Sequence, residues 1–209
     1  MTELNPAVRH PLANRVPAAA AFVLLVLAGT ALMTLSAKIQ IPFWPVPMTL
    51  HTFAVMAFAV VFGPRVAVSI VLAYLAAGAA GLPVFSGTPA RGIGIAYMVG
   101  PTGGYLAGFL LASGLVGWLA SGRGTVGRLG AMLAGLALVY ALGVAWLALF
   151  VPAGRLIALG VTPFLLGDLV KVGLVAVGAA LLPEHLAARA RALGARAGTR
   201  VRPGRGGWQ

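Results

Sequence analysis

Cysteine is absent from this 209-residue chain, and acidic residues are scarce, with 3 Asp and Glu in total. Without cysteine there is no disulfide framework, no thiolate nucleophile and no cysteine-based metal site. Charged residues make up 9% of the chain, whereas a soluble domain carries about 25%. The hydrophobic fraction is 60%, which is too high for a disordered chain. The composition therefore indicates a polytopic helical membrane protein.

Chemical motifs are also missing. The chain has no nucleophile–base–orienter set, no ATP-binding motif and no His/Asp/Glu cluster suited to a metal. We therefore expect neither an enzyme nor a cofactor or metal site. The net charge of +12 would suggest nucleic acid in a soluble protein. In a membrane protein, basic residues instead set topology and face anionic lipid, so we expect lipid contact and no nucleic acid.

Apolar segments of helical length alternate with stretches rich in glycine and proline. These breaks predict an all-α fold with six transmembrane helices. The expected helices are residues 18–37, 48–62, 66–80, 101–120, 129–151 and 161–182. The domain organisation is then an N-terminal segment 1–17, a membrane domain 18–182 that holds the substrate site, and a basic tail 183–209.

The basic residues predict which way the helices face. The N-terminal segment, the turns at 63–65 and 121–128, and the tail hold 11 Lys and Arg, whereas the other three loops hold 3. Cytoplasmic loops carry the excess of positive charge, so both termini are predicted to be cytoplasmic. The loops 38–47 and 81–100, which are rich in proline or glycine, then face outward. Elaborate loops on one face suggest a binding site that opens there.

Asp168 is the single acidic residue within a predicted span, and Lys171 follows three positions later on the same helix face. Either residue at a helix centre costs about 2.5–3.5 kcal/mol on insertion scales, so such a pair more often marks a functional site than a packing element. Asp168 lies about 10 Å below the outer end of its helix at 1.5 Å per residue. The pair is therefore predicted beneath the two outer loops.

Several other side chains near the outer face could contribute to a site. The segment Gly100–Tyr105 opens a helix whose free N–H groups suit an anion, although spacing alone favours a tight loop-to-helix entry. Arg91 either clamps an anionic group or is a solvated charge. His51 stands alone, and a lone histidine is more often a hydrogen-bonded structural residue than a ligand. The outer aromatic residues either anchor the membrane interface or wall a ring-binding pocket; these are Trp44, Phe85, Tyr97 and Tyr105.

Four stretches together resemble the BioY family of biotin-binding S components of energy-coupling factor (ECF) transporters. They are Ile41-Pro42 with Val46-Pro47-Met48-Thr49-Leu50, Tyr74-Leu75 with Gly81-Leu82-Pro83-Val84-Phe85, Gly100-Pro101-Thr102-Gly103-Gly104-Tyr105, and Pro163-Phe164 with Gly167-Asp168 and Lys171. They occur in the family's order and spacing from about residue 25 to 182. Two features depart from the family pattern: His51 stands where the family usually has Gln, and the small-residue pattern of the first helix is not clean.

The resemblance implies six helices, an outer pocket capped by the first and third loops, and Asp168 and Lys171 as ligand contacts. It also implies partners, namely two ATPase subunits and a coupling membrane protein; a homo-oligomer stays open. The full set of expected substrate-binding residues is Asp168, Lys171, Arg91, Tyr97, Thr102, Gly103, Tyr105, Phe85, Trp44 and Thr49.

The function expected from this resemblance is capture of biotin from the outer side of the bacterial cytoplasmic membrane for import. Biotin has a ureido group with two N–H donors and one carbonyl, an apolar thioether ring and a tail carboxylate. Asp168 could accept the ureido N–H groups, and Lys171, Arg91 or the helix start after Gly100 could meet the carboxylate. The alternatives are an S component for riboflavin or thiamine, and a structural membrane subunit or small channel.

Overall fold

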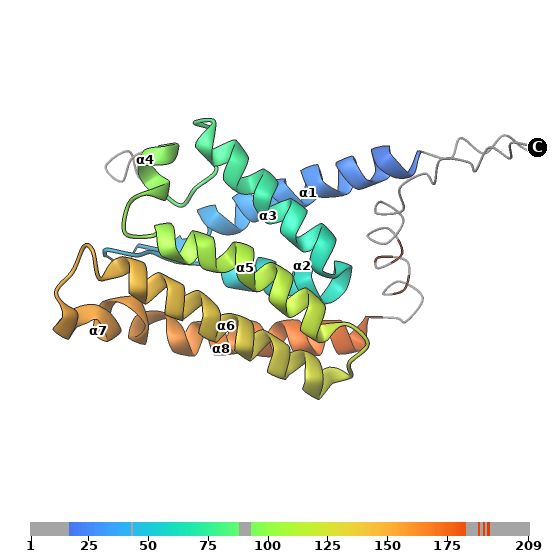
Figure 1. Cartoon of the computed structure of the whole chain (residues 1–209). Coiled ribbons are helices and arrows are strands. Elements are labelled where there is room, and N and C mark those ends of the chain that lie inside the picture. The colour runs from blue at the N-terminus through green and yellow to red at the C-terminus, as the bar shows by residue number, and fades with distance from the viewer. Residues whose placement is uncertain are drawn as a thin grey trace, which may run out of the picture.

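The computed structural model describes residues 17–42, 44–87 and 93–182, together with residues 188, 190 and 192. Six helices run back and forth between two ends of the molecule (Figure 1). They are α1 (Ala18–Lys38), α2 (His51–Phe62), α3 (Pro64–Ala79), α5 (Gly103–Ala120), α6 (Thr125–Leu147) and α8 (Thr162–Leu181). Nearly all of the predicted N-terminal segment and basic tail lie outside the described residues.

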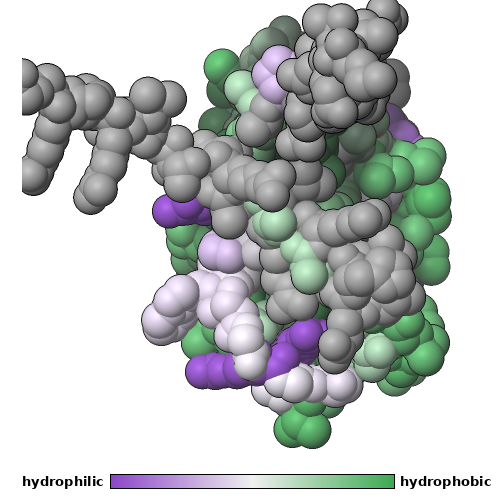
Figure 2. Space-filling view, turned by 90° about the vertical axis from the view of Figure 1, so that its right-hand side faces the viewer, coloured by the Kyte–Doolittle hydropathy of each residue, from purple (hydrophilic) through white to green (hydrophobic). Residues whose placement is uncertain are grey.

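Short elements gather at one end, which we call the loop end. They are β1 (Gln40–Ile41), β2 (Met48–Thr49), α4 (Ile95–Met98), the 3-10 helix η2 (Ala153–Arg155) and α7 (Leu156–Gly160). The opposite end carries the tight α2–α3 and α5–α6 turns. Figure 2 looks onto that end, where hydrophilic residues gather while hydrophobic residues show around the flanks.

The helical, membrane-type fold class is confirmed. Among the described residues, α1, α5, α6 and the stretch Ala153–Leu181 are long and apolar enough to cross a membrane. Helices α2 and α3 are apolar but shorter, with 12 and 16 residues. At 1.5 Å per residue, α2 extends only about 18 Å, against about 30 Å of hydrocarbon in a bilayer. Six full-length spans and the orientation of the termini therefore stay predictions.

The second helix begins later than the sequence predicts. The predicted start at residue 48 is wrong, because Met48 and Thr49 form β2 and pair antiparallel with Ile41 and Gln40. The preceding prolines favour extended backbone, and the short hairpin satisfies backbone groups that a helix would otherwise pair. Helix α2 therefore begins at His51, at the base of the hairpin.

The boundaries of α3, α5 and α6 move as well. Helix α3 begins at Pro64 instead of 66, and α5 begins at Gly103 instead of 101. Helix α6 spans Thr125–Leu147 instead of 129–151. The predicted loop 81–100 contains the one-turn helix α4. The turn before α6 is tighter than expected, because Gly122 adopts a φ of 72°, a left-handed conformation that glycine tolerates.

Helix α2 lies at the centre of the bundle. It contacts α1, α3, α5, α6 and α8, and most of its residues are buried. Helices α5 and α6 pack closely, since a Cβ at Gly108 would lie 2.9 Å from Cα of Val139. By contrast, 17% of the most apolar stretch of α1 is buried inside the structure, against 56% of the corresponding stretch of α5. The bundle therefore has a tight core around α2 and α5, with α1 at its periphery.

The loop after α3 folds back onto the bundle. Tyr74 donates a hydrogen bond to the carbonyl of Val84 at 3.4 Å, and Lys38 donates to the carbonyl of Phe85 at 2.7 Å. The ring of Phe85 occupies the space over Gly78, where any side chain would collide with it. Residues 82–87, which we call the 82–87 loop, are therefore held by both α1 and α3.

Candidate functional site

A cavity that is partly open to solvent lies at the loop end of the bundle. Its lining comes from the β2 region, α2, the 82–87 loop, α4, α5, α6 and α8. The lining residues are Val46, Pro47, Met48, Thr49, His51, Thr52, Ser86, Tyr97, Thr102, Tyr105, Leu106, Phe109, Val139, Tyr140, Phe164, Asp168 and Lys171.

One end of the cavity, the charged end, is built by Asp168, Lys171, Tyr140 and the Thr49 carbonyl. Lys171 Nζ lies 2.8 Å from Asp168 Oδ1 and donates to the Thr49 carbonyl at 2.6 Å. Tyr140 donates its hydroxyl to Asp168 Oδ2 at 2.8 Å. Asp168 and Lys171 are 5% and 7% exposed. The predicted pair is therefore real and buried, and helix spacing of three residues sets its geometry.

The charged end keeps hydrogen-bonding capacity for a ligand. An ionised carboxylate offers about four lone-pair sites, and the described residues occupy one on each oxygen of Asp168. An ammonium has three N–H donors, and two of those on Lys171 have partners among the described residues. A ligand that both donates and accepts hydrogen bonds therefore matches this end of the cavity.

His51 joins the charged end to α3. Its Nδ1 lies 3.0 Å from Thr49 Oγ1, and its Nε2 lies 2.8 Å from the Tyr74 hydroxyl. The ring also stands 5.4 Å from Phe109 between centroids. Both ring nitrogens thus bond to protein side chains, as expected for a hydrogen-bonded structural histidine. In addition, His51 forms part of the cavity wall.

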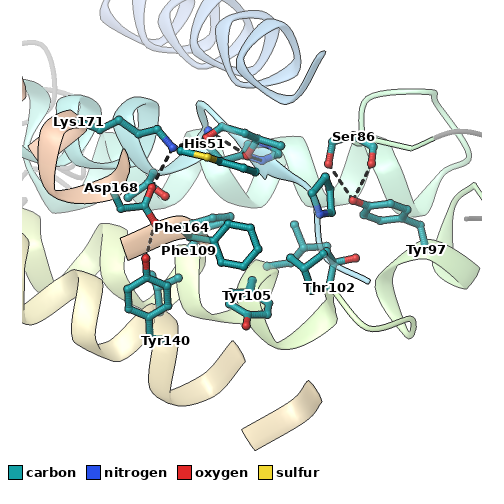
Figure 3. Close-up of a pocket in the computed structure, with 17 residues that line it drawn as sticks. His51, Ser86, Tyr97, Thr102, Tyr105, Phe109, Tyr140, Phe164, Asp168 and Lys171 are labelled. Carbon is teal, nitrogen blue, oxygen red and sulfur yellow. Dashed lines mark hydrogen bonds and ion pairs between the residues drawn. The ribbon is translucent and has the colours of Figure 1, made fainter. Parts of the chain in front are cut away.

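The other end of the cavity, the neutral end, is lined by Ser86, Tyr97 and Thr102. Tyr97 donates its hydroxyl to the Ser86 carbonyl at 2.9 Å, and Ser86 Oγ lies 2.9 Å from the same hydroxyl oxygen. Because Tyr97 donates its hydroxyl proton to the Ser86 carbonyl, the Ser86 hydroxyl is the donor in its bond to the Tyr97 oxygen. Figure 3 shows Ser86 and Tyr97 at one end of the lining and Lys171, Asp168 and Tyr140 at the other.

Apolar and aromatic side chains form the wall between these ends. Phe109, Phe164 and Tyr105 lie between the two polar groups in Figure 3. Leu106 and Val139 line the same cavity. The Tyr105 hydroxyl is committed to the Gly160 carbonyl at 2.7 Å, so its ring lines the cavity while its polar atom fixes α7. Such a wall favours an apolar ring system.

Six of the predicted site residues line the cavity: Asp168, Lys171, Thr49, Tyr97, Thr102 and Tyr105. Three others lie outside the lining. Phe85 stacks behind Tyr97, with ring centroids 4.9 Å apart. Gly103 packs against the Met98 carbonyl and Trp146, and Trp44 is 74% exposed. Arg91 lies outside the described residues.

Sequence reasoning missed Tyr140, Phe109 and Ser86 as cavity residues. Tyr140 and Phe109 sit within long apolar helices, where nothing in the spacing distinguishes a cavity face from a packing face. A hydroxyl-bearing aromatic residue in mid-span was the available signal for Tyr140. In the described part of the chain, no three His, Cys, Asp or Glu side chains gather as a metal site would require.

Comparison with known proteins gives consistent matches. The family model described as the BioY family matches residues 9–188. The chain is 39% identical over 162 residues to the "Probable biotin transporter BioY" of Pyrococcus horikoshii, covering 78% of this chain and 93% of that protein. It is 41% identical over 152 residues to the "Biotin transporter BioY" of Thermotoga maritima, covering 71% and 88%.

A solved structure has the same fold. The crystal structure of the S-component for biotin from an ECF-type ABC transporter superimposes with a TM-score of 0.66 and 27% sequence identity. The match covers 76% of this chain and 88% of that chain. The similarity therefore extends over most of both molecules.

Proposed function

Because the chain belongs to the BioY family, we propose that it is the biotin-binding membrane subunit of a vitamin uptake transporter. It captures biotin at the loop end and holds it in the cavity for import. The family comprises transporter subunits and not enzymes, and the relatives named above are described as biotin transporters. The observation that carries the proposal is the buried Asp168–Lys171–Tyr140 cluster at one end of a largely apolar cavity.

The ureido group of biotin matches the charged end better than its carboxylate does. The ion pair at 2.8 Å leaves this end close to neutral overall, so it offers little net attraction to a lone anion. It presents acceptor sites on Asp168 beside a donor on Lys171. A ureido group carries N–H donors beside a carbonyl acceptor. We therefore place its N–H groups on Asp168 and its carbonyl on the third N–H of Lys171.

The remainder of biotin then runs along the apolar wall toward the neutral end. The thioether ring lies against Phe109 and Phe164, which bury apolar surface at about 25 cal/mol per Å². The tail carboxylate lies near Thr102 and the start of α5, where helix N–H groups favour an anion. Arg91 remains a predicted partner for this carboxylate.

The chain is a multi-pass membrane protein, and we place it in the bacterial cytoplasmic membrane with both termini in the cytoplasm. The α2–α3 and α5–α6 turns at the end opposite the cavity carry Arg65 and Arg123, both exposed. That charge distribution supports a cytoplasmic placement of this end, where basic residues meet anionic lipid. The cavity then opens outward. Helices α2 and α3 complete six membrane segments, although each is shorter than a full span.

Import also needs an energy source that this chain lacks. The sequence contains no ATP-binding motif. We propose that two ATPase subunits and a coupling membrane subunit supply it, as the S-component likeness suggests.

Isothermal titration of the detergent-purified protein tests the proposed substrate. Biotin, riboflavin and thiamine are titrated separately under the same conditions. We expect tight one-to-one binding of biotin and no heat from the other two vitamins. Tight binding of riboflavin or thiamine without biotin would reassign the substrate, and binding of none would favour a structural subunit.

A further inference from the structure

His51 occupies a position from which it can act on both ends of the cavity. Its side chain is 3% exposed and lines the cavity wall. Both ring nitrogens bond to protein side chains, Nδ1 to Thr49 and Nε2 to Tyr74. Its ring therefore meets a ligand through its carbon atoms, and its polar atoms act through their partners.

The Nδ1 contact leads to the charged end. Thr49 Oγ1 bonds to His51 Nδ1 at 3.0 Å, and the carbonyl of the same threonine accepts the Lys171 bond at 2.6 Å. The Thr49 hydroxyl also accepts the His51 backbone N–H at 3.3 Å. Two bonds from His51 thus fix the orientation of the residue that holds the Lys171 ammonium.

The Nε2 contact leads to the 82–87 loop. Tyr74 donates to the Val84 carbonyl at 3.4 Å. In the tautomer that carries its proton on Nε2, His51 donates to the Tyr74 oxygen, and Nδ1 accepts from the Thr49 hydroxyl. Every donor in this chain of bonds has an acceptor in that tautomer. Ser86, two residues beyond Val84, lines the neutral end.

We propose that His51 is a positioning residue with two separable roles: through Thr49 it holds Lys171 at the ligand, and through Tyr74 it restrains the 82–87 loop. This inference rests on the proposed function for its ligand, biotin. The imidazole suits both roles because its two nitrogens lie on different edges of one rigid ring. An amide side chain can reproduce one of these contacts but not both.

Two substitutions separate the roles. In His51→Gln the longer amide reaches the position of Nε2 and keeps the Tyr74 bond, while the Thr49 bond is lost. In His51→Asn the shorter amide reaches the position of Nδ1 and keeps the Thr49 bond, while the Tyr74 bond is lost. Biotin affinity is measured by titration, and the association and dissociation rates by stopped-flow fluorescence.

We expect His51→Gln to weaken biotin affinity about fivefold, the scale of one lost hydrogen bond. We expect His51→Asn to keep affinity within about threefold and to raise both rates, because the Tyr74 contact restrains the loop without touching the ligand. Equal effects of the two substitutions on affinity and rates would overturn the proposal, since loss of general packing would act alike in both.

Double mutants distinguish positioning from packing. If His51 acts on Lys171 through Thr49, His51→Gln should have no further effect on affinity in a Thr49→Val background. It should keep its full effect in a Tyr74→Phe background. The same loss of affinity in both backgrounds would contradict the assigned route. These double-mutant cycles measure the energetic coupling of His51 to Thr49 and to Tyr74.

Controls keep the outcome interpretable. Wild-type protein that fails to bind biotin would count against the proposed function, whereas wild-type binding with unaffected His51 variants would refute this inference alone. Monodispersity and the thermal midpoint are compared for every variant. If the His51 variants do not fold, Thr49→Val must weaken affinity and Tyr74→Phe must speed exchange, and failure of either expectation also overturns the proposal.

Discussion

The two ends of the cavity are built from different kinds of structure. Asp168, Lys171 and Tyr140 come from the long helices α8 and α6 and bond to one another across them. Ser86 and Tyr97 come from the 82–87 loop and the one-turn helix α4, and they bond to each other. Side chains on long helices are held more accurately than those on loops. The contrast suggests that the charged end recognises the ligand while the neutral end controls access.

The ends also differ in what they cost the folded protein. Removing two charges from water carries a desolvation penalty of several kcal/mol per ion, which a buried pair regains only with good geometry. The neutral hydroxyls of Ser86 and Tyr97 cost less to bury, and each is hydrogen-bonded. A buried ion pair is therefore weak evidence for stability, and its presence at the cavity supports a role in binding.

The largest effect should come from removing the carboxylate. We predict that Asp168→Asn weakens biotin binding by at least about 1.5 kcal/mol, the scale of a hydrogen bond to a charged group. The substitution also leaves Lys171 buried without its counter-ion. Titration of the purified variant measures the change. A variant that folds normally and binds biotin as wild type does would remove Asp168 from the site.

A smaller effect at the same end should follow from Tyr140→Phe. The substitution keeps the ring and removes the donor that holds Asp168 Oδ2. We predict a loss of affinity of about 1 kcal/mol, or about fivefold. Tyr105→Phe is the matched control, because its hydroxyl bonds to the Gly160 carbonyl. Affinity in the control should stay within about twofold, and an equal loss in both variants would contradict a specific role for Tyr140.

Movement of the neutral end can be followed by labelling, because the chain has no native cysteine. We predict that biotin slows the reaction of Ser86→Cys with a water-soluble maleimide at least about threefold, since a closed loop excludes reagent as well as water. Ser121→Cys, at the exposed turn far from the cavity, should react at the same rate with and without biotin. An unchanged rate at Ser86→Cys under saturating biotin would favour a static loop.

The smallest effect is expected beyond the cavity. Deletion of the chain from about Ala187 onward should leave biotin affinity and membrane orientation unchanged, because we expect its arginines to be surplus to topology and to meet anionic lipid. Titration and a protease-accessibility assay on vesicles would check both. A well-folded truncated protein that no longer binds biotin would show that recognition extends past the two ends of the cavity.

Sequence reasoning succeeded where local rules decide the structure. The Asp168–Lys171 pair follows from helix periodicity and from the rarity of charge in an apolar segment, so both its existence and its contact could be predicted. The boundaries of α1 and α8 follow from the length of apolar runs and the prolines near them.

The neutral end and the third member of the cluster could not be predicted in the same way. Tyr140 meets Asp168 across 28 positions of sequence, and only the packing of α6 on α8 brings them together. Phe85 and Trp44 were expected in the site because outer aromatic residues suit a ring pocket. The fold of the loops, which no periodicity encodes, instead puts Phe85 behind Tyr97 and leaves Trp44 exposed.

The shortness of α2 has a consequence for substrate size. This central helix begins at His51 and has 12 residues, about 12 Å short of a full membrane crossing, and the cavity lies at its His51 end. The cavity thus occupies space that a longer α2 would fill, so helix length contributes to the volume available to a ligand. One additional turn would extend α2 by about 5.4 Å into this space, and one fewer would deepen it by as much. Helix length is therefore a coarse control on the size of molecule that this architecture can admit, and the side chains around it adjust the chemistry within that limit.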